Sequence, residues 1–562
     1  MRRRKDRVHC DGATISQVMS NAIVQVPFPQ NEPIHDYEPG SPRCDSLKAR
    51  LNALAAETVD IPCLIGGREV RTGHTAPCVM PHDHGHVLGQ FHQPGEKEVA
   101  LAIEAAASAW REWSCTPWED RAAVFLKMAS LLAGSHRDTI NAATMLGLSK
   151  NVFQSEIDAA CELIDFWNFN AFYTQEIYAA QPPHSPPGMW NQVENRSLEG
   201  FVFAVTPFNF TSIAANLPTA PVLMGNVALW KPSANAVYPT WFLMQLFREA
   251  GLPDGVINYL PGRGAQIGPQ VMAHPDLVGI HFTGSTPTFQ GMWQTVGANI
   301  KNYRSYPRIV GETGGKDFII AHESADTDAL ATAILRGAFE YQGQKCSAVS
   351  RVYIPSNIWD EVRERYVSEV AGLKMGDVRD FGNFMNAVID ERAFKKITGY
   401  IDAAKADEEA EIITGGNYDD SQGWFIEPTT ILTTNPKYRT MCEEIFGPVV
   451  TIHVYDPAQW SQTLELVDDT SPYALTGAVF ATERNAVLEA RVALTHAAGN
   501  FYINDKPTGA VVGQQPFGGG RVSGTNDKAG SPLNLLRWTS QRTVKENFVP
   551  PKDYRYPFMG AE

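Results

Sequence analysis

The sequence predicts an α/β protein with two halves, each of which alternates short apolar segments with helical patterns. The first alternation runs from about residue 200 to residue 311, and the second from about residue 318 to residue 501. This pattern is typical of a mostly parallel sheet that helices cover on both faces. The 562 residues are enough for two or three domains, and 44% hydrophobic with 19% charged residues is an ordinary globular composition.

The part of the chain before residue 200 is predicted to hold an extended arm and then a largely helical region. Residues 27–45 are rich in Pro, Asn, Asp and Ser, and a helical pattern follows at 47–56. Over 96–180, apolar residues such as Val99 and Ile103 recur at helical spacing. The prolines of 181–197 then mark a break between elements.

Five strands are predicted in the first alternating half, at 201–206, 227–231, 256–259, 278–282 and 308–311. The stretch from Gly200 to Trp230 has no charged residue and is long enough to suggest a membrane span. Pro207, Pro218 and Pro221 would break a spanning helix and leave polar groups unpaired. We therefore interpret the stretch as a buried strand, a loop and a helix of an α/β core.

The net charge and the cysteine pattern limit the classes of protein to which this chain can belong. The formal net charge of −15 and the pI near 5.5 argue against a general phosphate-binding surface, and hence against a nucleic-acid-binding role. The eight cysteines form no CxxC pair and no dense framework, which indicates a reducing compartment.

The N-terminus leaves the compartment open. Basic residues at 2–5 resemble the start of a targeting peptide, but no apolar stretch follows, and acids at 6 and 11 weaken a mitochondrial interpretation. Met19 is a second plausible start, so 1–18 are expected to be an upstream-start extension with little order. We expect a bacterial cytoplasmic protein; the alternative is the mitochondrial matrix if the source is eukaryotic.

Two segments suit covalent catalysis. In FEYQGQKCS, residues 339–347, Cys346 follows a Gly/Gln turn beside Lys345, and a nearby cation favours the nucleophilic thiolate. In VGETGGK, residues 310–316, Glu312 ends an apolar strand and could act as a general base. Taken singly, a buried inert cysteine and a turn with a surface acid are the ordinary alternatives.

Three further segments suit binding. TPFNFT, residues 206–211, places the amide of Asn209 where it could donate to a developing oxyanion. IHFTGS, residues 280–285, leads from a strand to a helix start that suits a pyrophosphate, and EEIFGP, residues 443–448, could hold a ribose diol and a flat ring. An ordinary turn is the alternative for each. The glycines of 262–268 have GxGxxxG spacing, which does not match the GxGxxG dinucleotide fingerprint.

Together these segments resemble the aldehyde dehydrogenase superfamily, whose signatures are GE-x-GGK, GQ-x-C and E-x-FGP. Cys346 lies 34 residues after Glu312, the spacing that this family shows. The resemblance runs from about Asn31 to the C-terminus. Within the superfamily, the chain is similar to enzymes that oxidise L-glutamate γ-semialdehyde, through residues 207–211, 339–347, 500–506, 513–519 and 523–528. Residues 506–512 and 531–540 are most similar to bacterial, actinobacterial-like members.

The resemblance implies the catalytic roles. Cys346 would attack the aldehyde, and the side-chain amide of Asn209 with the backbone N–H of Cys346 would hold the oxyanion. Hydride would pass to NAD, and Glu312 would activate the water that hydrolyses the resulting thioester.

The resemblance also implies a cofactor site, made by Lys231, Ser233, Ser285, Glu444, Phe446 and Phe208. Lys231 would contact the adenosine ribose, Ser285 the pyrophosphate and Glu444 the nicotinamide ribose. Many NAD-linked relatives carry an acid three residues after the lysine, where this chain has Ala234. Nothing at that position repels a 2′-phosphate, so NAD is expected and NADP is the alternative.

The resemblance implies six residues that would bind a zwitterionic substrate: Glu162, Phe210, Ser347, Gly509, Ala510 and Phe517. Glu162 would face the α-ammonium. Backbone N–H groups of Gly509 and Ala510, with the Ser347 hydroxyl, would bind the α-carboxylate. The two phenylalanines would enclose the aliphatic stem.

The implied fold is the aldehyde dehydrogenase fold: a Rossmann-like cofactor domain, an α/β catalytic domain and a small oligomerisation hairpin. The predicted division is an N-terminal arm (1–45), an NAD-binding domain (46–180 and 200–310), a catalytic domain (311–506), substrate-anchor loops (507–531), and an oligomerisation hairpin and tail (181–199 and 532–562). A homodimer or higher homo-oligomer is expected. The chain lacks room for a proline dehydrogenase domain, so a separate proline dehydrogenase would be a transient partner.

Three alternatives remain. The first is a dehydrogenase of another semialdehyde, such as succinic semialdehyde. That substrate has no ammonium group, so the carboxylate of Glu162 would have no role in binding it. A non-catalytic scaffold would be expected to lose Cys346, Glu312 or Asn209. The histidines of PHDHGH, residues 81–86, could suggest a metal, but no fourth ligand is evident, and we expect no metal and a solvated polar turn.

Overall fold

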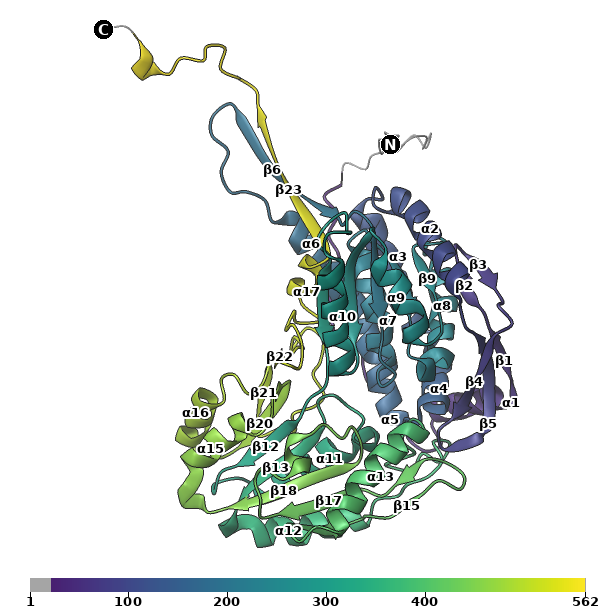
Figure 1. Ribbon diagram of the computed structural model, residues 1–562, viewed down its shortest axis with the longest axis vertical. Helices are drawn as coiled ribbons and strands as arrows, with labels where there is room; N and C mark the ends of the chain where they lie inside the picture. Colours follow the sequence, from purple (N-terminus) through teal and green to yellow (C-terminus); the bar gives the residue numbers. More distant parts are fainter. Residues whose placement is uncertain (1–21, 561–562) are drawn as a thin grey trace.

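The computed structural model describes residues 22–560, and the expectations for 1–18 and Met19 lie outside these described residues. Within them the chain forms two lobes, each built on a seven-stranded sheet, and a β-ribbon that projects from one end (Figure 1). We call the lobe that contains β7 the first lobe and the lobe that contains β13 the second lobe.

The first lobe has a central sheet that is parallel through five strands. In spatial order its strands are β11 (Arg308–Glu312), β10 (Leu277–Thr283), β7 (Phe201–Val205), β8 (Val227–Lys231), β9 (Ile257–Tyr259), β2 (Cys63–Ile65) and β3 (Arg68–Val70). Only β2 and β3, at one edge, run antiparallel to their neighbours. All five strands predicted for this half are confirmed, with ends that differ by at most one residue.

Helices cover both faces of this sheet, which explains why β7 and β8 are buried along their whole length. Its helices are α2 (Glu96–Trp113), α3 (Trp118–Ala133), α4 (Arg137–Leu148), α5 (Val152–Ser155), α6 (Glu162–Ala179), α7 (Thr211–Leu223), α8 (Val237–Ala250), α9 (Gly264–Ala273) and α10 (Thr286–Asn299). A π-helical segment, Glu156–Cys161, joins α5 to α6. The predicted helical region at 96–180 is therefore confirmed.

The uncharged stretch 200–230 forms β7, α7 and most of β8, as the sequence predicts for a buried α/β core. Pro218 and Pro221 lie inside α7, which is buried along nearly its whole length. No helix of the described residues combines the length and the apolarity that crossing a membrane requires.

The second lobe repeats the architecture. Its strands, in spatial order, are β14 (Ala410–Thr414), β17 (Thr429–Thr433), β18 (Val449–Tyr455), β13 (Val349–Pro355), β12 (Asp317–Ala321), β20 (Thr476–Phe480) and β21 (Asn500–Ile503), and only β14 is antiparallel. One apolar core lies under α13 (Glu391–Lys405), α15 (Trp460–Asp469) and α16 (Arg484–Ala493). A second core lies on the opposite face, under α11 (Thr327–Phe339) and α12 (Ser356–Ala371).

Short elements complete this lobe and its connections: α14 (Arg439–Cys442), α17 (Pro532–Leu536), β15 (Tyr418–Asp419) with β16 (Phe425–Ile426), and β19 (Tyr473–Ala474) with β22 (Gly520–Arg521).

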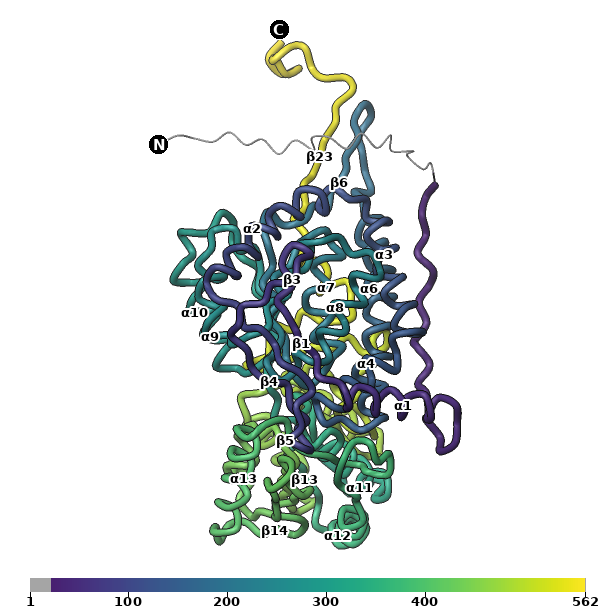
Figure 2. The backbone as a smooth tube through the Cα atoms, turned by 90° about the vertical axis from the view of Figure 1, so that its right-hand side faces the viewer, coloured from purple at the N-terminus to yellow at the C-terminus, as the bar shows by residue number. Residues whose placement is uncertain are grey.

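The N-terminal arm is extended as predicted, but it ends sooner. Helix α1 (Pro42–Ala56) begins inside the predicted arm, because the Ser41 side chain accepts from the Cys44 N–H and Pro42 suits the first helical position. Before it, residues 23–37 run along the first lobe as a strap (Figure 2). Hydrogen bonds from Asn31 to Asp165 and from the Glu32 N–H to the same carboxylate fix the strap to α6.

The histidine segment 81–86 corrects an expectation. It joins β4 (Thr75–Met80) to β5 (Asp83–His92), which with β1 (Val59–Ile61) forms a three-stranded sheet. His82 is buried and lies 3.2 Å from the Ser149 hydroxyl, and burial lowers its pKa to about 4. The ring nitrogens of His84 and His86 reach backbone carbonyls. The segment is thus not a solvated turn; across residues 22–560 there is no group of three or more His, Cys, Asp or Glu side chains that could hold a metal ion.

The projecting ribbon pairs β6 (Met189–Ser197) with β23 (Thr539–Asn547) through nine antiparallel positions (Figure 1). The residues just before β23 pack elsewhere: Trp538 is fully buried against the first lobe beside His281. The predicted tail therefore begins too early at 532. The predicted domain division after residue 310 likewise falls inside β11, which continues to Glu312 in the first sheet.

Candidate active site

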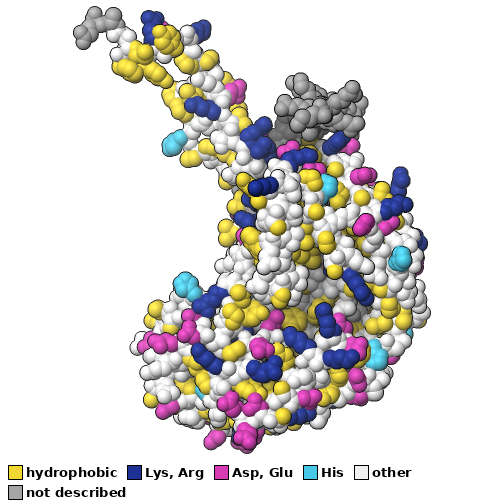
Figure 3. Space-filling model, in the orientation of Figure 1, with side chains coloured by type: hydrophobic (Ala, Val, Ile, Leu, Met, Phe, Trp, Pro, Cys, Tyr) yellow, Lys and Arg dark blue, Asp and Glu magenta, His cyan; other side chains and the backbone are white. Residues whose placement is uncertain are grey.

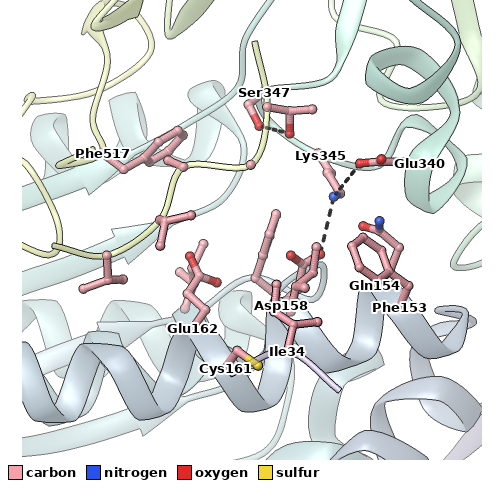
Figure 4. Close-up of a pocket in the computed structure, with 18 of the residues that line it drawn as sticks. Ile34, Phe153, Gln154, Asp158, Cys161, Glu162, Glu340, Lys345, Ser347 and Phe517 are labelled. Atoms are coloured by element: carbon pink, nitrogen blue, oxygen red, sulfur yellow. Dashed lines mark hydrogen bonds and ion pairs between the residues drawn. The ribbon is translucent and has the colours of Figure 1, made fainter. Parts of the chain in front are cut away.

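A cavity of about 670 Å³ lies where the strap, the helices α5 and α6, the segment before β13 and the loop after β21 meet (Figure 4). Predicted site residues that line it are Glu162, Phe210, Cys346, Ser347, Gly509, Ala510 and Phe517. These residues come from both lobes, so only the folded chain brings them together.

The loop that carries Cys346 is held in a strained conformation. Tyr341, Gln342 and Gly343 are consecutive residues with φ of 50°, 55° and 64°. This left-handed region is unfavourable for residues other than glycine. Gly343 has no room for a side chain, since a Cβ would lie 2.2 Å from the Gly447 carbonyl oxygen. Hydrogen bonds from the Tyr341 hydroxyl and the Gln342 amide to carbonyls of the first lobe hold the loop.

The Cys346 thiol is buried, and burial raises its pKa above the usual range for cysteine. The carboxylates of Asp317, Glu312 and Glu444 raise it further. The prediction that the Lys345 cation favours the Cys346 thiolate is wrong. The Lys345 ammonium points into the cavity, 3.6 Å from both Asp158 and Glu340, and does not act on the thiol (Figure 4). Sequence adjacency to a cation does not place that cation beside the sulfur.

Asn209 follows β7 and lies against the Cys346 loop. Its Nδ2 donates to the Gln344 carbonyl at 3.0 Å, and the residue is 4% exposed. Because a carboxamide nitrogen carries two hydrogens, this bond leaves one of them unused beside the nucleophile loop.

Glu312 ends β11, and its Oε2 accepts from the Gly519 N–H at 3.0 Å. Burial raises the pKa of this carboxyl well above its usual range, while that hydrogen bond and Lys528 act in the opposite direction. The result is a shielded carboxyl group, more basic than an exposed glutamate. Glu312 lies where the two lobes meet the 518–524 loop. No other residue can replace Gly524 in this loop, because a Cβ there would lie 2.8 Å from Oε2 of Glu312.

Two residues of the predicted cofactor set lie at the carboxyl ends of parallel strands in the first sheet. Lys231 ends β8; burial lowers its pKa to about 8, and no hydrogen bond or ion pair reaches its ammonium from the described residues. Ser285 is exposed at the start of α10, where it precedes a helix with no acid in its first turn. Ser233 follows Lys231 at the same edge of the sheet and is half-buried.

The remaining cofactor candidates gather near the nucleophile loop. Glu444 accepts from the Gly315 N–H at 3.0 Å, and burial raises its pKa. Gly314 must lack a side chain, because a Cβ would lie 2.0 Å from the Glu444 carboxylate. Phe446 meets Phe208 edge to face with ring centroids 5.9 Å apart.

On the opposite wall, Glu162 opens α6 and accepts from the Ser212 hydroxyl. Burial, followed by the neighbouring charge of Asp158, raises the pKa of Glu162 to about 8. Phe210 lies between the two walls, and the Lys150 ammonium sits 4.5 Å from its ring centroid.

The predicted carboxylate anchor faces Glu162 across the cavity. The Ser347 hydroxyl lies 2.9 Å from that of Thr508. Gly509 adopts φ 98°, a conformation that other residues rarely take, and Ala510 and Phe517 complete the same wall.

Comparisons with known proteins agree with this geometry. Residues 69–544 match the sequence profile described as the Aldehyde dehydrogenase family. The chain belongs to the aldehyde dehydrogenase family.

Within the family, the chain is 52% identical to a mitochondrial delta-1-pyrroline-5-carboxylate dehydrogenase of Dictyostelium discoideum, over 96% of this chain and 97% of that protein. It is 47% identical to the mitochondrial enzyme of that name from Bos taurus, over 94% of each chain. A crystal structure of the delta-pyrroline-5-carboxylate dehydrogenase from Mycobacterium tuberculosis, bound with NAD, has a TM-score of 0.93 and 53% identity, and the match covers 96% of this chain and all of that one.

Sequence reasoning missed part of the cavity of this aldehyde dehydrogenase. Asp158 lines it four residues before Glu162, a helical spacing that could have indicated a shared face. Asn31 and Ile34 of the strap also line it, and Asn31 donates to the Val512 carbonyl at 2.7 Å. No local pattern in the sequence pointed to the strap, because its partners lie more than a hundred residues away.

Proposed function

We propose that this aldehyde dehydrogenase oxidises L-glutamate γ-semialdehyde, the open form of Δ1-pyrroline-5-carboxylate, to L-glutamate with NAD+, the second step of proline degradation. The observation that carries the proposal is the arrangement of the cavity. A nucleophile, Cys346, lies on it, with the acid Glu162 on one wall and the Ser347–Gly509 anchor on the other. The names of the relatives that match over nearly the whole chain support the same substrate.

The first step is addition of the Cys346 sulfur, once deprotonated, to the aldehyde carbon. The C=O π electrons move to oxygen, and the free hydrogen of Asn209 Nδ2 with the Cys346 backbone N–H would stabilise the oxyanion. Holding these donors in place beforehand lowers the barrier, because they need no reorganisation during the reaction.

When bound, NAD+ supplies the hydride acceptor, and the two-electron oxidation leaves a thioester on Cys346. The residues present fit such a cofactor. The Lys231 ammonium has no partner among the described residues, and the exposed start of α10 at Ser285 suits a phosphate. Because Gly314 has no side chain, the Glu444 carboxylate can lie close to the backbone there. Ser233, Phe446 and Phe208 would complete the set. The chain also lacks an acid at Ala234, so NADP is tested alongside NAD.

The second step is hydrolysis. Glu312 would take a proton from water, whose oxygen attacks the thioester carbon and releases the Cys346 sulfur with L-glutamate. Its raised pKa suits this role, since a more basic carboxylate accepts a proton more readily. In this structure the Gly519 N–H donates to Oε2 of Glu312, which leaves Oε1 to accept a proton.

The substrate's charges match the walls. The α-ammonium would lie against Glu162, and the α-carboxylate against Ser347 and the N–H groups of Gly509 and Ala510, with Phe210 and Phe517 around the stem. Succinic semialdehyde has no ammonium, so it would leave Glu162 unused.

The test is NADH formation with L-glutamate γ-semialdehyde, beside succinic semialdehyde, with NADP in place of NAD and with Cys346→Ala as the control. A strong preference for the first substrate with NAD, lost in the control, supports the proposal. A preference for succinic semialdehyde would overturn the roles of Glu162 and Gly509, and no activity in the wild type would overturn the function.

We also propose a homodimer or higher homo-oligomer. The projecting ribbon and the tail beyond it expose apolar side chains that include Trp190, Phe548, Val549, Tyr554 and Phe558 (Figure 3). Exposed apolar surface of this kind is typical of an interface between subunits. Light scattering during size-exclusion chromatography tests this, and a monomer mass would contradict it.

The proposed compartment is the bacterial cytoplasm, supported by the likeness to the Mycobacterium tuberculosis enzyme; the relatives named mitochondrial are from eukaryotes. A proline dehydrogenase is the proposed supplier of the substrate through transient contact. Cell fractionation and co-purification test these two points separately.

A further inference from the structure

Five charged side chains alternate in sign beside the cavity, and four of them line it. The order is Lys150, Asp158, Lys345, Glu340 and Lys506, and we call this row the charge ladder. Successive nitrogen–oxygen distances are 2.6 Å, 3.6 Å, 3.6 Å and 3.4 Å. Figure 4 shows Lys345 at its centre, linked to Asp158 on one side and Glu340 on the other. The ladder thus connects the first lobe to the second beside the nucleophile.

The two ends of the ladder differ. Lys150 is fully buried, with its ammonium 4.5 Å and 4.4 Å from the ring centroids of Phe210 and Tyr341. At the other end, the Lys506 side chain is 22% exposed, the most of the five. Among residues 22–560, Glu340 is the carboxylate that pairs with the Lys506 ammonium, and Glu340 is shared with Lys345; Asp158 interacts with the Lys506 charge at longer range. The charge of Lys506 is therefore the least neutralised.

Lys506 also braces the predicted anchor. Its Nζ donates to the Thr508 carbonyl at 3.0 Å, and a Cβ on Gly509 would lie 3.1 Å from that nitrogen. The Thr508 hydroxyl in turn meets the Ser347 hydroxyl at 2.9 Å. The Lys506 cation is thus attached directly to the backbone that would bind a carboxylate.

The charges do not balance. Three lysines face two carboxylates, and an alternating row that ends on a cation beside Gly509 is completed by an anion there. Arg336, which also lines the cavity, adds to the positive potential, and the acid Glu162 lies on α6 across the cavity. The positive end of the cavity therefore coincides with the anchor loop, and the carboxyl group of Glu162 lies opposite.

We propose that Lys506 is a specificity-determining residue that selects aldehydes with an α-carboxylate, held in place for that role by the charge ladder. The substrate's carboxylate takes the sixth position of the alternating row. This inference rests on the proposed function and adds to it a residue that recognises the carboxylate by charge, where the backbone N–H groups recognise it by hydrogen bonding.

The experiment compares Lys506→Met and Lys506→Gln with the wild type, with Lys506→Arg as the conservative variant and Lys395→Met as a control. Lys395 is an exposed lysine with one carboxylate partner among the described residues, Glu391, and it does not line the cavity. Two quantities are measured: kcat/KM for L-glutamate γ-semialdehyde against propanal, which has no carboxylate, and the Kd of the product L-glutamate by calorimetry.

Removing the charge is expected to lower kcat/KM for the semialdehyde about tenfold and to weaken L-glutamate binding about tenfold, or about 1.4 kcal/mol. Propanal turnover and the KM for NAD should change little, and Lys506→Arg should restore most of the loss. Lys506→Gln keeps a donor for the Thr508 carbonyl, so it separates loss of charge from collapse of the loop.

Equal loss with both aldehydes, or wild-type binding of L-glutamate in the Met and Gln variants, would overturn the role of Lys506. If the wild type oxidises the semialdehyde while those variants match it, only this inference fails. If the wild type does not oxidise the semialdehyde at all, the proposed function fails first and this inference falls with it.

Discussion

Replacing Asn209 by alanine separates the oxyanion role of this residue from its structural role. The Asn209 amide donates one hydrogen to the Gln344 carbonyl, two residues before the nucleophile, and its second hydrogen is available to the reacting oxygen. Alanine removes both donors. It should therefore loosen the nucleophile loop slightly and remove most of the stabilisation of the oxyanion.

The two effects differ in size. Loss of one ordinary buried hydrogen bond lowers the free energy of unfolding by about 1 kcal/mol. Loss of a preorganised donor to an oxyanion lowers kcat by about 10² to 10³-fold, or roughly 2.7–4 kcal/mol of transition-state stabilisation. Because charge develops on the oxygen only in the transition state, KM should change much less than kcat.

The assay is steady-state NADH formation together with urea unfolding. Asn170→Ala is the matched control: Asn170 is also buried and also makes one side-chain hydrogen bond, to Asn216 at 3.1 Å, but that bond joins two helices of the first lobe and does not reach the nucleophile loop. We expect both variants to lose similar stability and only Asn209→Ala to lose activity. Equal kcat values in the two variants would refute the assignment of Asn209 to the oxyanion.

Three further predictions follow from other groups. Glu312→Gln should slow thioester hydrolysis about 10²-fold or more, because water loses its base; stopped-flow absorbance should show a burst of one NADH per site, and an unchanged steady-state rate would contradict the role. The KM for the semialdehyde should fall as pH rises through about 8, since Glu162 is neutral below that pH and becomes anionic toward the substrate's ammonium above it; Glu162→Gln should flatten this profile, and a wild-type KM that is flat or rises would count against the assignment. Glu156→Gln should lower the free energy of unfolding by about 3 kcal/mol, because the buried Arg137 loses its fully buried charge partner and keeps only the more exposed Glu32, whereas Glu391→Gln, in an exposed pair, should have little effect; similar urea midpoints for the two variants would refute the difference.

The sequence by itself determined the elements that depend on local patterns. Strand β8 forms at the predicted 227–231, because a run of apolar residues bounded by polar ones suits a strand with both faces buried. The resemblance of the segments around Glu312 and Cys346 to aldehyde dehydrogenase signatures predicted the reaction class. The glycines in these segments mark positions where the backbone must approach another group closely. Gly314 beside Glu444 and Gly343 beside Gly447 are examples.

Only the tertiary structure decided what each side chain faces. Lys345 stands next to Cys346 in sequence, yet its charge is directed to Asp158 and Glu340, and the thiol pKa is set by burial and by carboxylates. His82 lies in a polar sequence, yet it is buried. In both cases the environment is supplied by chain segments that are distant in sequence, and burial and Coulomb interactions depend on distance in space. Local sequence patterns do not predict distances between remote chain segments. The charge ladder and the contacts of the strap could therefore be identified only from the folded structure.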